Sequence, residues 1–433
     1  MTAKMKMNGE NKMSDHEKII AIANECNLKT KKDSIHLHKK RPQERYTEYV
    51  YRIPHGLSYE RFADKLNEFN DGMNIKKRER SFTWKGLKEL RAYIQDKQFS
   101  RDSFIDDLNG MFFIKNDVNK RVTISFDGML KFKVFDKPVP LKVDFDESFL
   151  EGCTDWKIPL GDNGEEVLKW KIGREHMAIA GGTRQGKSQF TKLLIATLIK
   201  LYPDMIKFSF FDLKGGVTMD RFKNLEQTQH FAESAEDSMY ALDAIYEEMM
   251  EIQAYCKSKG VETADEAGLY TKHFVVIDEA AELSPEIKKN RKDELKYRRQ
   301  CEMRLSEIAR LGAGFNIILI FSTQYPTADV MNKDIKSNIG QVVCFKLRSG
   351  RQSQTVLDKW GAEKLEAPGR ALVIDGVINH KVQVPLIDND YISRIIGPHI
   401  VIKSREDVEH EKTHEETGKN GEDTLIIEDA WDC

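Results

Sequence analysis

The chain has 433 residues, of which 40% are hydrophobic and 32% are charged. This composition excludes global disorder, and the length allows two or three domains of roughly 150 residues. Lysines and arginines number 68 against 70 aspartates and glutamates, so the net charge of −2 gives no overall attraction to nucleic acid. Any DNA contact must come from a local basic surface.

The cysteines, histidines and apolar runs exclude further classes. Six cysteines occur without a CxxC pair, and the 11 histidines show no metal-ligand spacing, so we expect reduced thiols and no zinc site. The longest apolar runs, such as 274–277 and 317–321, are far shorter than the roughly 20 residues that cross a bilayer. The first residues lack the apolar stretch of a secretory signal. We expect a cytoplasmic protein with no membrane span of its own.

The first 150 residues are predicted to form an arm and a small domain. Residues 1–45 show little periodicity apart from a short possible helix near 19–26, so they are predicted to be a mobile basic arm, either a solvated lead-in or a contact for nucleic acid or a partner. Residues 46–150 are predicted to be a small α+β domain. They contain a strand at 46–53, a helical pattern of Phe62, Leu66 and Phe69, and a hairpin around Asp127-Gly128. The segment 137–164, with its prolines, acids and glycines, reads as a linker that pairs briefly before the next domain.

Residues 151–395 have the pattern of an α/β domain with a mostly parallel sheet. Short β-rich runs alternate with long helical periods, one of which carries a methionine-rich stripe from 239 to 256 that we expect to be core. Residues 396–433 are rich in acids and are predicted to be a disordered tail. The β-rich runs are 176–181, 206–213, 273–280, 316–324, 341–347 and 370–375.

A phosphate-binding motif follows the first of these runs. Residues 181–188 fit GxxxxGK[ST] between a predicted strand and a predicted helix, which is the context that separates this motif from an ordinary glycine-rich turn. Backbone N–H groups of such a loop converge on phosphate oxygens, Lys187 reaches the β and γ phosphates, and Ser188 ligates Mg²⁺. We therefore expect ATP and Mg²⁺ as ligands. The predicted nucleotide-binding residues are Gly181, Gly182, Thr183, Arg184, Gln185, Gly186, Lys187, Ser188 and Gln189.

Polar residues end two later strands at the expected ligand edge of the sheet. Asp278 and Glu279 follow the apolar residues 274–277. Paired acids at a strand end are common on surfaces. Beside a phosphate loop, however, they predict that Asp278 anchors Mg²⁺ and that Glu279 orients or deprotonates the attacking water. Gln324 ends the run 316–324, and its amide can hydrogen-bond a γ-phosphate or the water. A simple strand cap is the alternative.

These residues, in this order, resemble the FtsK/SpoIIIE family of DNA-pumping ATPases over about 46–390. The resemblance implies a RecA-like P-loop motor domain preceded by a small α+β domain, working as a ring, a homo-hexamer, on double-stranded DNA. The soluble form is most similar to FtsK-type proteins of conjugative plasmids, integrative elements or phages of Gram-positive bacteria. Further matching segments are 211–216, 314–326, 329–330, 335–339, 355–358 and 361–365.

Three departures limit what the resemblance implies. The membrane-spanning N-terminus of the family is absent, so recruitment to a membrane needs a partner such as a channel component or a relaxase. Few residues follow 390, so we expect no winged-helix reader of DNA sequence. The family's Ser-Arg-Thr is here Ser353-Gln354-Thr355, so the trans-acting arginine is displaced; Arg351 is our candidate, with Arg348 as the alternative.

Residues 288–310 form the strongly basic stretch of the predicted motor domain, and either DNA phosphates or plain solvation would explain it. The main hypothesis is an ATP-driven motor that translocates double-stranded DNA for transfer or segregation of mobile-element DNA. One alternative is a protein-secretion ATPase of the same superfamily, although those chains usually carry several motor domains. Another is a nucleotide-switched DNA-binding replication or partition factor.

Overall fold

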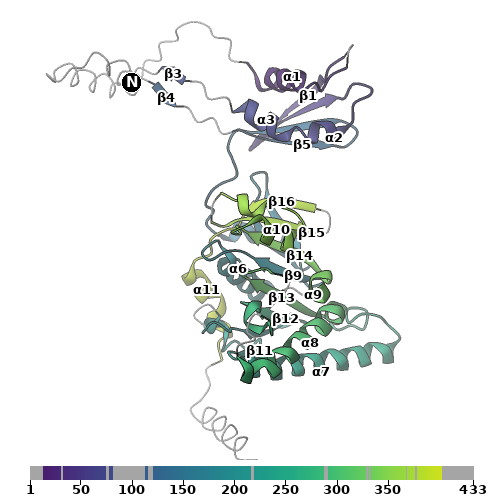
Figure 1. Cartoon of the computed structure of the whole chain (residues 1–433), viewed down its shortest axis with the longest axis vertical. Helices are drawn as coiled ribbons and strands as arrows, with labels where there is room; N and C mark the ends of the chain where they lie inside the picture. Colours follow the sequence, from purple (N-terminus) through teal and green to yellow (C-terminus); the bar gives the residue numbers. More distant parts are fainter. Residues whose placement is uncertain are drawn as a thin grey trace, which may run out of the picture. The chain divides into compact units, whose positions relative to one another are not determined.

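The computed structural model describes residues 13–30, 33–74, 78–80, 113–115, 120–215, 219–286, 291–327, 330, 333–366, 368–375 and 378–401. The described chain divides into two compact units, each with a hydrophobic core. The first comprises the residues up to Pro140 together with Asp162–Val167, and the second comprises Leu141–Gly161 and the residues from Leu168 onward. Figure 1 labels most of the helices and strands of both.

The first unit is an antiparallel sheet covered by helices on one face. The strand order is β1-β2-β6-β5, and the helices pack against alternate strand residues such as Tyr49, Tyr51 and Phe132. Gly128, with φ at +89°, turns the predicted hairpin between β5 and β6. The predicted small α+β domain is thus confirmed as a fold. The elements are α1 (Asp15–Glu25), β1 (His36–Pro42), β2 (Tyr46–Arg52), α2 (Tyr59–Ala63), α3 (Leu66–Met73), β5 (Arg121–Phe126) and β6 (Leu130–Phe135), with a separate pair β3 (Arg78–Arg80) and β4 (Phe113–Lys115).

The prediction of a mobile arm over residues 1–45 is wrong for two segments. Helix α1 begins with a capping box in which Ser14 and Glu17 satisfy each other's backbone N–H groups, and it buries Ile19 and Ile22 in the core. Strand β1 pairs with β2. Its basic, unalternating sequence carries no strand pattern, because an edge strand exposed on both faces needs none. Residues 1–12 and 31–32 lie outside the described part of the chain.

The second unit is built on a ten-stranded sheet in the order β11-β10-β12-β13-β9-β14-β15-β16-β7-β8. The strands from β11 to β14 pair in parallel, whereas β15 pairs antiparallel with both β14 and β16. The strands are β7 (Lys157–Asp162), β8 (Val167–Lys171), β9 (His176–Ala180), β10 (Ile206–Phe211), β11 (Thr228–Ala232), β12 (Lys272–Ile277), β13 (Ile317–Thr323), β14 (Ile339–Phe345), β15 (Arg370–Asp375) and β16 (Ile378–Gln383).

Helices cover both faces of this sheet, and each face has its own core. One core joins α6 (Lys187–Leu201) and α11 (Asn389–Ile396) to the sheet. The other joins α7 (Ala235–Lys259), α8 (Leu295–Leu311), α9 (Lys333–Ser337) and α10 (Gly350–Leu357), and the methionine-rich stripe of α7 is buried there through Leu242, Ile245 and Met249. A sheet buried on both faces explains why its strands read as continuous apolar runs.

The predicted mostly parallel α/β fold is confirmed, and all six β-rich runs are strands. The sequence reasoning missed β7, β8, β11 and β16, and β7 lies in the segment that reads as a linker. Of the predicted acidic tail, only residues 396–401 are described. The helices of the described residues include none that is long and apolar enough to cross a membrane.

Candidate functional site

The predicted phosphate loop connects β9 to α6. Gly186 has φ at +122° and Arg184 has φ at +62°, so the loop turns sharply before the helix begins at Lys187. The loop lies against Phe345 at the end of β14: a Cβ atom on Gly181 would come within 2.7 Å of the Phe345 Cβ, and one on Gly186 within 2.9 Å of its Cε1. Glycine is therefore required at both positions for the loop to keep this path.

Lys187 reaches the end of β12. Its Nζ donates to the backbone oxygen of Asp278 at 2.6 Å, to the Asp278 Oδ1 at 3.0 Å and to the Ser322 Oγ at 3.0 Å. The lysine is 3% exposed and Asp278 is 6% exposed, so this ion pair is buried. Ser322, near the end of β13, was missed by sequence reasoning, since a serine inside an apolar strand matches no motif. The predicted lysine and acid are therefore in direct contact.

Glu279 is also buried, with both carboxylate oxygens occupied. Oε1 accepts from Thr323 Oγ1 at 2.9 Å and from the Gln324 backbone N–H at 3.1 Å. Oε2 lies 3.2 Å from the same backbone nitrogen and accepts from Lys214 Nζ at 2.6 Å. The ends of β10, β12 and β13 thus meet at this carboxylate, because parallel neighbouring strands end at one edge.

Gln324 contacts the phosphate loop itself. Its Oε1 accepts a hydrogen bond from the Thr183 hydroxyl at 3.0 Å. The amide is thereby joined to the loop through its side chain and to Glu279 through its backbone N–H. A change at the loop can therefore reach the carboxylate through a single residue.

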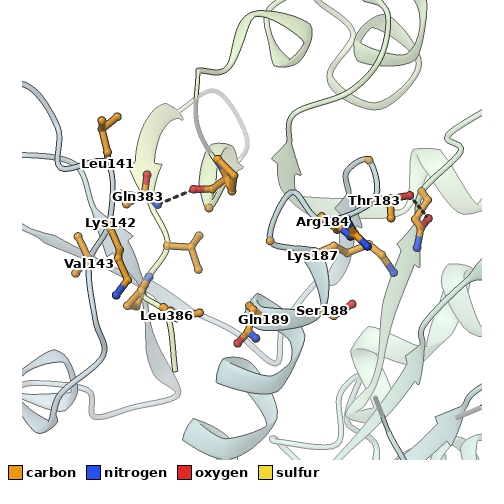
Figure 2. Close-up of a pocket in the computed structure, with 17 residues that line it drawn as sticks. Leu141, Lys142, Val143, Thr183, Arg184, Lys187, Ser188, Gln189, Gln383 and Leu386 are labelled. Carbon is orange, nitrogen blue, oxygen red and sulfur yellow. Dashed lines mark hydrogen bonds between the residues drawn. The ribbon is translucent and has the colours of Figure 1, made fainter. Parts of the chain in front are cut away.

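A cavity of about 460 Å³ lies beside the loop and has two chemically different walls. The loop wall is polar and includes Lys187, Ser188 and Gln324, whereas Leu141, Val143 and Leu386 form an apolar wall across from it (Figure 2). The apolar wall is held together by backbone bonds, since the Leu386 N–H donates to the Val143 oxygen at 2.8 Å. Sequence reasoning missed this wall, because its residues come from two short segments about 240 positions apart without a motif. The other lining residues are Lys142, Gly182, Thr183, Arg184, Gly186, Gln189, Pro368, Gly369, Gln383, Val384 and Pro385.

The remaining predicted nucleotide-binding residues lie in or next to this cavity. Gly181 and Gln185 are loop residues outside its lining: Gly181 donates its N–H to the Thr323 oxygen at 3.2 Å, and the Gln185 oxygen accepts from Gly369 at 2.8 Å. These bonds fix the loop between β13 and the chain that leads into the apolar wall.

The residues present fit a Mg²⁺ ion bound together with phosphate. The described residues contain no group of three or more His, Cys, Asp or Glu side chains that would hold a metal by themselves. Mg²⁺ is usually bound by one or two protein oxygens plus substrate phosphates and water, so a dedicated cage is not needed. Ser188 lines the cavity, whereas Asp278 lies outside its lining and accepts from Lys187 Nζ through Oδ1 at 3.0 Å.

The structure leaves the predicted arginines away from this cavity. Arg351 lies on α10, is exposed and does not line the cavity. Arg348 is also exposed, and its guanidinium carbon lies 5.7 Å from the centre of the Tyr325 ring. Neither arginine meets Lys187, Asp278 or Glu279 within the described chain.

The basic stretch 288–310 is only partly available to a ligand. Arg298 is buried and paired with Glu294, and Arg304 pairs with Asp243 at 2.6 Å and with Glu307 at 2.9 Å. These arginines hold α8 in place. Exposed cations remain at Arg291, Lys292, Lys296, Arg299 and Arg310. Lys288 and Lys289 lie outside the described residues.

Comparison with known proteins identifies similar sequences and a similar fold. Residues 155–358 match the FtsK/SpoIIIE family. The chain is 29% identical to the DNA translocase FtsK of Streptococcus pneumoniae (strain ATCC BAA-255 / R6) over 291 residues, covering 62% of this chain and 35% of that protein. It is 26% identical to the DNA translocase SpoIIIE of Bacillus subtilis (strain 168) over 281 residues, covering 60% and 34%. The chain thus spans about a third of the length of these curated relatives.

A solved structure extends the likeness in fold beyond the matched family region. The pCW3 conjugation coupling protein TcpA, in its monomer form with ATPγS, superimposes with a TM-score of 0.57 at 17% identity. The alignment covers 89% of this chain and 99% of that one. At this identity the likeness concerns the fold.

Proposed function

Residues 155–358 match the FtsK/SpoIIIE family, and from this match we propose that the chain is an ATP-driven motor that translocates double-stranded DNA. The observation that carries the proposal is the meeting of Lys187, Asp278, Glu279 and Gln324 at one sheet edge beside a cavity with a polar and an apolar wall. A nucleotide has the same two halves, a charged phosphate chain and a flat apolar base.

The phosphate loop supplies the groups that hold ATP. Lys187 donates to Asp278 and Ser322, and phosphate oxygens would take over as its acceptors. Ser188 and Asp278 would hold Mg²⁺, which neutralises charge on the phosphates. The base would lie against Leu141, Val143 and Leu386. The other predicted loop residues line the cavity or hold the loop in place through backbone hydrogen bonds.

Glu279 and Gln324 connect the site to the rest of the domain. We assign Glu279 to orienting or deprotonating the attacking water, which requires that one of its oxygens be released from its present donors. Gln324 joins Thr183 of the loop to that same carboxylate and is assigned to sensing the γ-phosphate. The coupling between nucleotide state and DNA grip would start at this residue.

The names of the relatives support the choice of DNA as the moved polymer and of transfer as the process. Two matched proteins are DNA translocases, and the solved structure with the same fold is a conjugation coupling protein. The proposal therefore includes duplex DNA of a mobile element, a homo-hexameric ring, and delivery from the cytoplasm to a relaxase or a membrane channel component.

The test is ATP hydrolysis by the purified chain with and without long duplex DNA. We expect DNA to accelerate hydrolysis, and Lys187→Ala or Glu279→Gln to abolish it, whereas Lys200→Ala, an exposed lysine on the same helix, keeps the wild-type rate. Displacement of a triplex strand from a long template would then show movement. Equal rates with and without DNA would overturn the proposal in favour of a secretion motor or a nucleotide switch.

Arg351 is assigned to the site of a neighbouring copy. It is exposed and does not reach the cavity of its own chain, so it remains available to another subunit. An arginine acting in this way contributes roughly 10³–10⁵ in rate. We expect Arg351→Ala and Lys187→Ala each to be inactive alone and a mixture of the two to regain DNA-stimulated hydrolysis, because mixed rings contain some complete sites. A mixture without activity, or equal loss in Arg348→Ala alone, would contradict the assignment.

A further inference from the structure

Strand β1 of the first unit is an exposed basic edge. It is the outer strand of its sheet and pairs only with β2 among the described strands. All seven of its residues are exposed. Three of them, Lys39, Lys40 and Arg41, are basic, and none is acidic.

The register places these cations on both sides of the strand. Lys39 lies opposite Val50 and Arg41 opposite Glu48, on the sheet face that carries no helices, where Arg52 and Lys131 also lie. Lys40 lies opposite Tyr49 on the helical side, with its Nζ 5.6 Å from the Tyr49 ring centre. Arg41 is paired with Glu48 at 3.0 Å. Lys39, Lys40 and Arg52 have no ion-pair partner within the described chain.

Charge is separated across this unit. The helices α1, α2 and α3 carry six acids, Asp15, Glu17, Glu25, Glu60, Glu68 and Asp71, against the bases Lys18 and Arg61. The acids therefore outnumber the bases on these helices, whereas β1 carries basic side chains and no acid. A polyanion approaching this unit is attracted to the β1 edge and repelled by the helices.

The cations of the strand suit a nucleic-acid backbone by their charge. Successive side chains of a strand point to opposite faces, so Lys39 and Arg52 lie on one side of the edge and Lys40 lies on the other. Phosphates on either side of the edge can therefore meet an exposed lysine or arginine. We propose that β1, through Lys39, Lys40 and the adjacent Arg52, binds the phosphate backbone of duplex DNA without reading its sequence. The inference rests on the proposed function for its ligand and adds a contact outside the matched family region.

Edge protection is the competing explanation. Lysines on an edge strand prevent pairing with other chains, and that role requires only a charge of either sign. An acidic protein segment is the competing partner. A reversal of charge separates edge protection from DNA binding, because glutamate still blocks edge pairing while it repels phosphate. Direct binding to a labelled duplex separates DNA from an acidic protein segment as the partner.

The experiment compares two double variants of the full chain. Lys39→Glu with Lys40→Glu reverses the charge of two β1 side chains and leaves the Arg41–Glu48 pair intact. Lys29→Glu with Arg61→Glu reverses two exposed bases outside the sheet and changes the net charge equally. Binding to a labelled duplex without nucleotide is measured by fluorescence anisotropy over a salt series, with a second duplex of scrambled sequence.

We expect the strand variant to bind DNA at least tenfold more weakly at low salt, with the slope of log affinity against log salt reduced by about 2, since each phosphate contact contributes about 0.9. The control should keep the wild-type slope, and both duplexes should behave alike. If the strand variant kept the wild-type affinity for DNA and the wild-type salt slope, the inference about β1 would be wrong, and the proposed function would not be affected. A wild-type chain that neither binds DNA nor is stimulated by it would overturn the proposed function as well.

Discussion

The ammonium nitrogen of Lys214 lies 2.6 Å from Oε2 of Glu279, so a half-exposed cation at the end of β10 holds a buried carboxylate at the end of β12. Thr323 and the Gln324 backbone occupy the rest of that carboxylate. Three donors thus occupy most of the roughly four lone-pair sites that a carboxylate offers, and Lys214 is the charged one among them.

Release of this contact should raise hydrolysis in the absence of DNA. We predict that Lys214→Ala increases the DNA-independent rate about three- to tenfold, because a partly exposed charge-assisted hydrogen bond contributes about 1 kcal/mol. Stimulation by DNA should fall by the same factor. The measurement is steady-state ATP hydrolysis with and without duplex, with Lys223→Ala, an exposed lysine paired with Glu233, as the control. A basal rate at or below that of wild type would show that Lys214 does not restrain Glu279.

Thr183 and Gln324 should act as one unit. Their side chains meet at 3.0 Å, so removing either partner breaks the same bond. We predict that Thr183→Val and Gln324→Ala each lower DNA-stimulated turnover and that the double variant is no worse than the more affected single variant. The double-mutant cycle in turnover measures this, with unfolding curves to show that stability changes by less than about 1 kcal/mol. Additive losses would mean that the two residues act independently.

The apolar wall of the cavity should contribute affinity for the base and nothing to the phosphates. We predict that Leu386→Ala weakens ATP binding about three- to tenfold, since a partly exposed leucine side chain loses about 1 kcal/mol of burial. Inorganic triphosphate should compete equally well with labelled nucleotide in both proteins. Ile400→Ala, a similarly exposed apolar residue outside the cavity lining, is the control. If Leu386→Ala weakened the binding of triphosphate by the same factor, Leu386 would act by shaping the phosphate loop and not by contacting the base.

His176 should make the second unit sensitive to acid. Burial lowers the pKa of this imidazole from 6.5 to about 4, and its Nδ1 accepts from the Leu319 N–H at 2.9 Å in the neutral form. The unfolded chain binds its proton first as pH falls, so stability is complete above pH 6.5 and is lost progressively towards pH 4, by about 3 kcal/mol in total.

Urea unfolding between pH 7.5 and 4.5 measures this loss. The variant His176→Asn should start less stable at pH 7.5 and show a shallower decline over this interval. The difference between the two proteins in the slope of unfolding free energy against pH is the contribution of the histidine. Parallel curves for the two proteins would rule out His176 as its source.

Much of the second unit could be predicted from its residues, and the reason is the burial of its sheet on both faces. The runs at 176–181, 206–213 and 273–280 are mostly apolar because both faces of those strands are buried. The glycines of the loop were predictable from their motif. The edge strands β1 and β8 were not, because an exposed or half-exposed strand has no periodic apolar signal.

The site divides in the same way. Its loop, acids and amide stand at the ends of predicted strands, and parallel pairing in the order β12-β13-β9 brings them together. The apolar wall and Ser322 carry no local signal, since each matters only through what folding places beside it. Lys214 lies in the matching segment 211–216, but its contact with Glu279 depends on which strands are neighbours in the sheet.

The sequence by itself determined the phosphate loop, the positions of the buried strands along the chain and the strand ends at which the polar residues lie, because these depend on local patterns of glycine, charge and apolar runs. Tertiary structure alone decided that Lys187 contacts Asp278, that Lys214 occupies Glu279 and that residues near 141 and 386 close one cavity. Contacts between segments far apart in the chain depend on sheet order and packing, which no local pattern encodes.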